Sequence, residues 1–103
     1  MKKAEVFVNN RRSGILEEIT PGKKYQFIYN KGYSGHPISL TMPIADTPYI
    51  YDRFPPFFEG LLPEGYNLDA LLRVYKIDRN DLFRQLVVVG MDMVGAVTVR
   101  EIK

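Results

Sequence analysis

The chain has 103 residues, 46% of them hydrophobic, and its 14 Lys and Arg against 12 Asp and Glu leave a net charge of +2. A chain of this length and apolar content forms one core and is not disordered, so we expect a single domain over residues 1–103. It contains no cysteine, which excludes disulfides and thiolate metal sites, and its scattered charges indicate neither nucleic acid nor lipid as a partner.

Nothing in the sequence predicts export or membrane insertion. No charged-then-apolar leader precedes the first strand-like segment, and the longest mainly apolar run, residues 86–89, is far shorter than the roughly 20 residues that cross a bilayer. We therefore expect a cytoplasmic protein that does not enter the membrane.

The first thirty residues predict three antiparallel strands. Residues 4–9, 15–19 and 25–29 alternate between two faces with the period of two that marks a strand. Turn-forming residues at 9–14 and 20–23 separate these segments, which predicts a three-stranded meander.

The next segment predicts a short edge strand followed by a loop. Residues 38–42 alternate until Pro43 ends the run, because proline cannot donate to a sheet ladder. Residues 43–53 show neither the helical nor the strand period, so we expect them to cross the surface as a loop.

Helical patterns begin at Phe54. The proline pair 55–56 suits the first turn of a helix, and Gly60 and Pro63 limit that helix to about two turns. Asn67 is a candidate N-cap for a second helix, whose apolar stripe has the spacing i, i+3, i+4, i+7. The stripe consists of Leu68, Leu71, Leu72 and Tyr75.

A third helix and a last strand complete the predicted elements. Asp78 is a candidate cap for the third helix, which ends at residues 89–90. Gly95 opens a final strand over residues 96–102. The predicted fold class is therefore α+β, a small antiparallel sheet with short helices packed on one face.

The sequence offers no residue set for catalysis, for a cofactor or for a metal. Its one histidine, His36, stands between glycine and proline in a predicted loop, without a nucleophile that it could activate. Glu59 and Glu64 are separated by a glycine and a proline, so their spacing does not define a general acid and base, and no phosphate-binding glycine motif is present. We predict that the protein is not an enzyme and neither hydrolyses nor transfers phosphate from ATP.

Nucleic-acid binding is an alternative function. The basic pairs at 11–12 and 23–24 could lie near each other at hairpin ends and contact phosphates. Tyr25, Phe27 and Tyr29 could stack bases on an open sheet, although an alternating aromatic strand is more typical of a core. Domains that bind nucleic acid usually carry a stronger basic footprint, which makes this the weaker hypothesis.

Four segments resemble the N-terminal subdomain of HipA-type toxin kinases. Residues 56–65, PFFEGLLPEG, resemble the family signature PFFxxLLPEG. Residues 6–14 resemble its VxVNGxxxG start, residues 38–43 its LSLSLP strand, and residues 90–97 its GxDxxGAV element. The resemblance therefore covers nearly the whole chain.

The chain departs from the family pattern at Asn10, where Gly is found, at Gly60, where Asn is common, and at Tyr66, where Trp often follows the signature. None of these changes alters the expected fold. A kinase of this family would continue beyond Lys103 into its nucleotide-binding and catalytic parts, so the resemblance implies no kinase activity here. The chain is either an excised piece of such a kinase or a free-standing protein similar to the HipS-like antitoxins of three-gene HipBST modules. We favour the second because the 103 residues are taken as the whole protein.

The resemblance also implies the partners. A HipS-like antitoxin binds and neutralises a HipT-like serine/threonine kinase toxin in trans, and a HipB-like DNA-binding protein joins through the complex. Kinases of this type phosphorylate aminoacyl-tRNA synthetases and so arrest translation. No cofactor, no direct contact with nucleic acid and no membrane are implied.

The turn that follows the signature is the expected kinase-binding site. Its residues are Pro63, Glu64, Gly65 and Tyr66. Proline and glycine fix a protruding turn, on which Tyr66 would be the anchor and Glu64 a polar neighbour near the nucleotide-side loops of the kinase. An open alternative is that Tyr66 packs back near Ala70 as a helix-entry staple. The apolar signature residues are expected in the core, namely Phe57, Phe58, Leu61 and Leu62.

Overall fold

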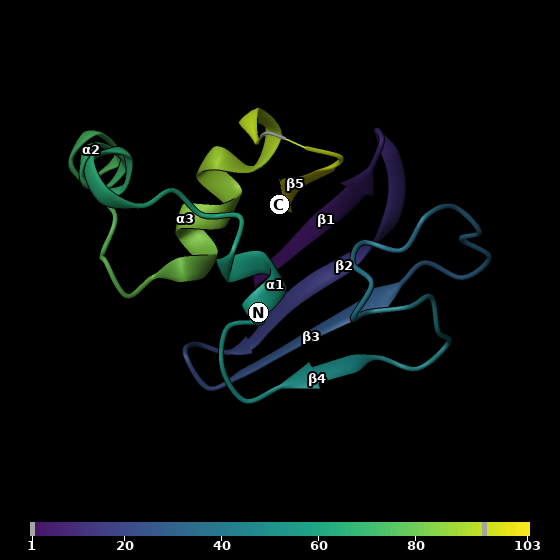
Figure 1. The fold of residues 1–103 in the computed structure, drawn as a ribbon. Coiled ribbons are helices and arrows are strands. Elements are labelled where there is room, and N and C mark those ends of the chain that lie inside the picture. The colour runs from purple at the N-terminus through teal and green to yellow at the C-terminus, as the bar shows by residue number, and fades with distance from the viewer. Residues whose placement is uncertain (1, 94) are drawn as a thin grey trace.

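The computed structural model describes residues 2–93 and 95–103; Met1 and Val94, the latter within the family-like segment 90–97, lie outside the described residues. The described chain forms an antiparallel sheet of five strands in the order β4-β3-β2-β1-β5, with short helices over one face (Figure 1). The strands are β1 (Lys2–Val8), β2 (Arg11–Thr20), β3 (Lys24–Tyr29), β4 (Tyr49–Tyr51) and β5 (Val97–Ile102). The helices are α1 (Pro56–Glu59), α2 (Gly65–Tyr75) and α3 (Leu82–Val89), which continues into the short 3-10 helix η1 (Gly90–Asp92). The predicted α+β class is confirmed.

The hydrophobic core lies between the sheet and the helices α1 and α3. Alternate residues of the strands face these helices, as the period of two predicts. The buried core residues are Ala4, Val6, Val8, Leu16, Tyr25, Phe27, Tyr29, Ile38, Met42, Phe54, Phe58, Phe83, Leu86, Val97 and Val99.

An aromatic row on β3 organises this core. Tyr25, Phe27 and Tyr29 are all buried on the helix-covered face. Phe54 contacts Tyr25 edge to face, with ring centroids 5.4 Å apart, and Phe58 of α1 packs at 6.0 Å from Phe27. The row therefore fixes where the segment leading into α1 crosses the sheet.

The fourth strand is not where the sequence predicts it. The segment 38–42 forms a turn with one isolated bridge between Ser39 and Met42, whereas Tyr49–Tyr51, predicted as loop, pairs with β3 as β4. The Tyr29 hydroxyl accepts a hydrogen bond from the Ile38 N–H and donates one to the Met42 carbonyl, which closes the turn. These two backbone groups are therefore not available to pair with a neighbouring strand.

The helix starts also differ from the predicted ones. Helix α1 has only one turn, and α2 begins at Gly65 rather than after Asn67, because Gly65 adopts a φ of +59° that turns the chain into the helix three residues earlier. Asp81 rather than Asp78 caps α3, since its carboxylate accepts the N–H of Arg84 at 3.0 Å. Asp78 instead accepts the N–H of Asn80 in the preceding turn.

Helix α2 is the outermost element of the molecule. It lies beyond α3 and away from the sheet in Figure 1, and Leu71 is its one buried residue. It ends at Lys76, which adopts the left-handed conformation, and the N–H of Ile77 returns to the carbonyl of Leu72. By contrast the C-terminal end of α3 lies directly against the sheet: the backbone at Gly90 is so close to β5 that a Cβ there would overlap the Val99 carbonyl.

Replacing Phe58 by alanine tests whether the β3 aromatic row carries the fold. Phe58 is fully buried against Phe27 and Phe57, so Phe58→Ala should lower the free energy of unfolding by about 3–5 kcal/mol. Urea denaturation followed by circular dichroism measures it. Leu40, which is 95% exposed, is the control, and Leu40→Ala should change stability by no more than about 0.5 kcal/mol. Equal losses for the two variants would contradict this placement of the core.

Alkaline pH should destabilise the fold through its buried phenols. Burial raises the pKa of Tyr25, Tyr29 and Tyr51 above the ordinary value of 10.0, and the Tyr25 hydroxyl also donates to the buried Glu18 carboxylate. Because the folded state favours the neutral phenols, their contribution to stability is complete below pH 10 and is lost as the pH rises through the raised folded values. The urea midpoint should therefore fall as the pH rises above about 10. The fall should be smaller in Tyr25→Phe, and an identical fall in that variant would exclude a role for Tyr25.

Candidate functional site

A turn at the exposed end of α2 brings together the four residues predicted to bind a kinase. After α1 the chain makes a further turn, in which the N–H groups of Leu61 and Leu62 donate hydrogen bonds to carbonyls of α1. Glu64 is extended, with φ −129° and ψ 164°, and Gly65 then turns into α2. A Cβ at Gly65 would meet nothing within 4 Å, so glycine is favoured here by its positive φ and not by lack of space.

Tyr66 projects from this turn into solvent. It is 93% exposed, so its ring does not pack near Ala70, and the helix-staple alternative is wrong. Glu64 and Gly65 are exposed as well, and Pro63 is half-buried. The Glu64 carboxylate makes no capping hydrogen bond to α2.

Helix α2 extends this exposed surface. Val74 and Tyr75 are 67% and 58% exposed, although Tyr75 belongs to the stripe that predicted a buried helical face. The ion pair between Arg79 and Asp69, 2.9 Å long and exposed at both ends, connects α2 to the following loop. A pair of this kind adds little stability, so α2 is held mainly by its apolar contacts.

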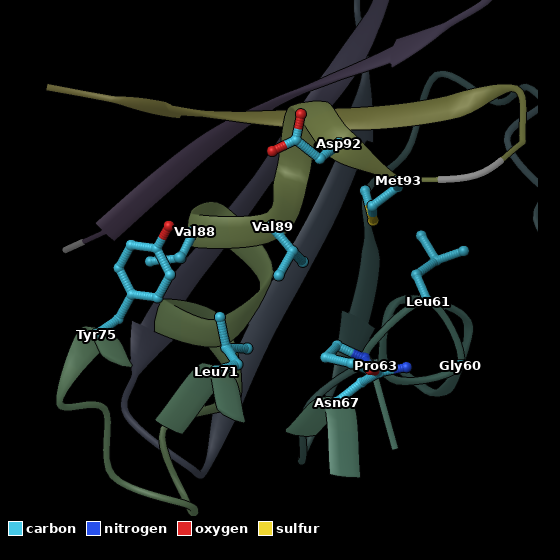
Figure 2. A pocket seen from close by; sticks show the side chains of 10 residues that line it. All are labelled: Gly60, Leu61, Pro63, Asn67, Leu71, Tyr75, Val88, Val89, Asp92 and Met93. Atoms are coloured by element: carbon cyan, nitrogen blue, oxygen red, sulfur yellow. The ribbon is translucent and has the colours of Figure 1, made fainter. Parts of the chain in front are cut away.

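A groove lies between α2 and the α3–η1 segment, as Figure 2 shows. Its volume is about 490 Å³. The lining residues are Gly60, Leu61, Pro63, Asn67, Leu71, Tyr75, Val88, Val89, Asp92 and Met93. Sequence reasoning missed this groove because the periodicity of α2 gives the direction of its apolar stripe but not how closely the helix approaches α3.

The apolar residues of the family-like signature divide between the core and the surface. Phe58 is fully buried, as predicted. Phe57, Leu61 and Leu62 are only half-buried, packed against the edge of the core. Leu61 also lines the groove, so the prediction that all four belong to the core holds in full only for Phe58.

The structure separates the basic residues on which the nucleic-acid alternative rests. Arg11 and Arg12 begin β2, whereas Lys24 pairs with Thr20 at its other end, about 30 Å away for a strand of this length. The aromatic row of β3 is buried under α1 and offers no open face for stacking bases. Neither feature required by that alternative is therefore present in the described chain.

The described residues contain no group of three or more His, Cys, Asp or Glu side chains that could hold a metal ion. His36 is exposed in a loop, where no described residue forms an ion pair with it. No helix in the described part of the chain has the length and apolar character needed to cross a membrane.

The fold and its exposed turn define a small α+β domain with a candidate protein-binding surface. The family model described as the HipA N-terminal domain matches residues 4–100. An uncharacterized protein of Haemophilus influenzae Rd is 36% identical over 103 residues, which make up 100% of this chain and 95% of that protein. A solved structure described as the N-terminal domain of HipA toxin has a TM-score of 0.78 and 32% identity, with 100% of this chain and 94% of that chain covered. The chain belongs to the HipA N-terminal domain family, which confirms the predicted resemblance.

Two neighbouring substitutions should separate the backbone of the turn from its exposed side chain. Gly65→Ala should lower the free energy of unfolding by about 1–2 kcal/mol, because alanine is strained at positive φ. Tyr66→Ala should change it by no more than about 0.5 kcal/mol, because the ring is exposed. Thermal and urea denaturation of both variants measure the difference. A larger loss for Tyr66→Ala than for Gly65→Ala would mean that the ring supports the fold.

Proposed function

We propose that this protein is a HipS-like antitoxin, which binds a HipT-like serine/threonine kinase toxin in trans and neutralises it. The observation that carries the proposal is Tyr66, a large aromatic side chain that is 93% exposed on a turn with a defined backbone. A tyrosine placed in this way can bury its ring in a partner while its hydroxyl keeps a hydrogen bond, and tyrosine is enriched among the residues that dominate interfaces.

The proposed contact is the turn Pro63–Tyr66. Tyr66 is the anchor, and Glu64 is a polar neighbour that lies near the nucleotide-side loops of the kinase. Because the turn is fixed by its own backbone, little conformational entropy is lost when it is buried, and this favours tight binding. An interface of standard size, about 1,600 Å² in total, would be sufficient.

Family membership supports a role within a HipA-type module, and the Haemophilus relative supports a free-standing form. That protein is matched over 95% of its own length, which leaves no room in it for a kinase domain. The alternative is an N-terminal subdomain of a longer HipA-type kinase, and it is favoured by the likeness to a structure described as the N-terminal domain of HipA toxin. A neighbouring reading frame that encodes a kinase core without this subdomain would decide for the free-standing antitoxin.

In the proposed function the protein acts by binding and not by catalysis. It requires no cofactor, and a HipB-like DNA-binding protein is reached only through the kinase complex. The distance between the two ends of β2, where the basic pairs lie, argues against direct binding to nucleic acid.

Co-expression with the HipT-like kinase of the same genome tests the proposal. The two chains should elute as one complex in size-exclusion chromatography, and the kinase in that complex should no longer phosphorylate its substrate. Tyr66→Ala should weaken binding by about 2 kcal/mol or more, which is roughly 30-fold in the dissociation constant, because a buried anchor is removed. Leu40→Ala, at another side chain that is almost fully exposed, should bind like the wild type.

Separate elution of the two wild-type chains would reject the proposed function. Equal binding by Tyr66→Ala and the wild type would leave the antitoxin function standing but remove Tyr66 from the contact.

A further inference from the structure

The groove between α2 and α3–η1 has the form of a site for an extended segment of protein. Figure 2 shows Leu61, Pro63 and Met93 on one side and the valines of α3 on the other. Asn67 and Asp92 stand at opposite ends of the lining, and Tyr75 adds a hydroxyl beside Val88. A lining that is mainly apolar, with an amide at one end and a carboxylate at the other, suits a chain that places apolar side chains in the middle and a polar one beyond them.

The charge of the groove indicates which polar group the partner carries. Among the described lining residues Asp92 is the charged one, and no Lys, Arg or His of the described chain forms an ion pair with it. Asp92 also ends the continuous helical run of α3 and η1. The partial negative charge of a helix C-terminus disfavours a carboxylate and attracts a cation.

The groove is continuous with the turn proposed to bind the kinase. Pro63 belongs to both surfaces, and Asn67 lies one residue beyond Tyr66. A partner that covers the ring of Tyr66 therefore has the groove within reach.

We propose that the groove binds a peptide segment of the partner in which apolar side chains are followed or preceded by a lysine or arginine, and that this cation lies against Asp92. The inference rests on the proposed function in one respect, since the kinase is then the protein that supplies the segment. The groove would extend the contact well beyond the single anchor Tyr66 and would select partners by the sign of their charge.

Selection from a random peptide display library on the full 103-residue chain tests the chemistry of the groove without any kinase. Enriched peptides should combine apolar residues with Lys or Arg and should shift the amide resonances of Val88 and Val89 in the labelled protein. A synthetic copy of the strongest peptide should bind Asp92→Lys at least about tenfold more weakly, which is about 1.4 kcal/mol. Asp46→Lys makes the same charge change at an exposed aspartate in the loop before β4, and it should bind like the wild type.

Three results of the selection would overturn the proposal. They are the enrichment of no peptide, enrichment of peptides without a basic residue, and equal binding of the strongest peptide by Asp92→Lys and Asp46→Lys.

The same two variants, tested with the kinase, separate this inference from the proposed function. Weaker kinase binding by Asp92→Lys alone supports both. Equal kinase binding by both variants would overturn the groove as part of the contact while the antitoxin function stands. If no variant and no wild-type chain binds the kinase but the peptide results are as expected, the proposed function fails and the chemistry of the groove stands.

Discussion

The packing of aromatic rings on β3 is the constraint on which the rest of the structure depends. Phe54 packs on Tyr25 and Phe58 packs on Phe27. The helical half of the chain therefore meets the sheet at aromatic contacts whose spacing is set by alternate residues of β3. The same row holds the loop after β3, where the Tyr29 hydroxyl bonds to the backbone of Ile38 and Met42. The turn over residues 38–42 and the stretch from Phe54 to Phe58 are thereby both positioned by alternate residues of one strand.

The position of the exposed turn follows from this packing. With Phe58 fixed over the sheet, the chain leaves α1 at the edge of the core, and the extended Glu64 carries it outward before Gly65 starts α2. The C-terminal end of α3 lies close against β5, because the residue that follows the helix at this contact is Gly90, which has no side chain. Helix α2 has no comparable contact with the sheet, so an apolar surface is left between it and α3.

Residue patterns in the sequence predict most of the fold but not the details that depend on single backbone conformations or on distant partners. The alternation of Tyr25, Phe27 and Tyr29 is strong enough to identify a strand and its buried face. The segment 38–42 alternates too, yet its hydrogen bonds go to a tyrosine hydroxyl, which no local pattern reveals. Exposure of the turn residues follows from Pro63 and Gly65. The groove depends on how closely the consecutive helices α2 and α3 approach each other, which their residue patterns do not give, so it could not be predicted.

The exposure of Tyr66 also bears on how such a protein can change over evolutionary time. A side chain that is 93% exposed can be exchanged with little loss of stability, because it makes few contacts within the fold. Under the proposed function, selection at this position acts through binding to the partner, whereas substitutions at Phe58 are constrained by the core. Duplicated copies of this domain can therefore diverge in specificity one surface residue at a time while they keep the same scaffold.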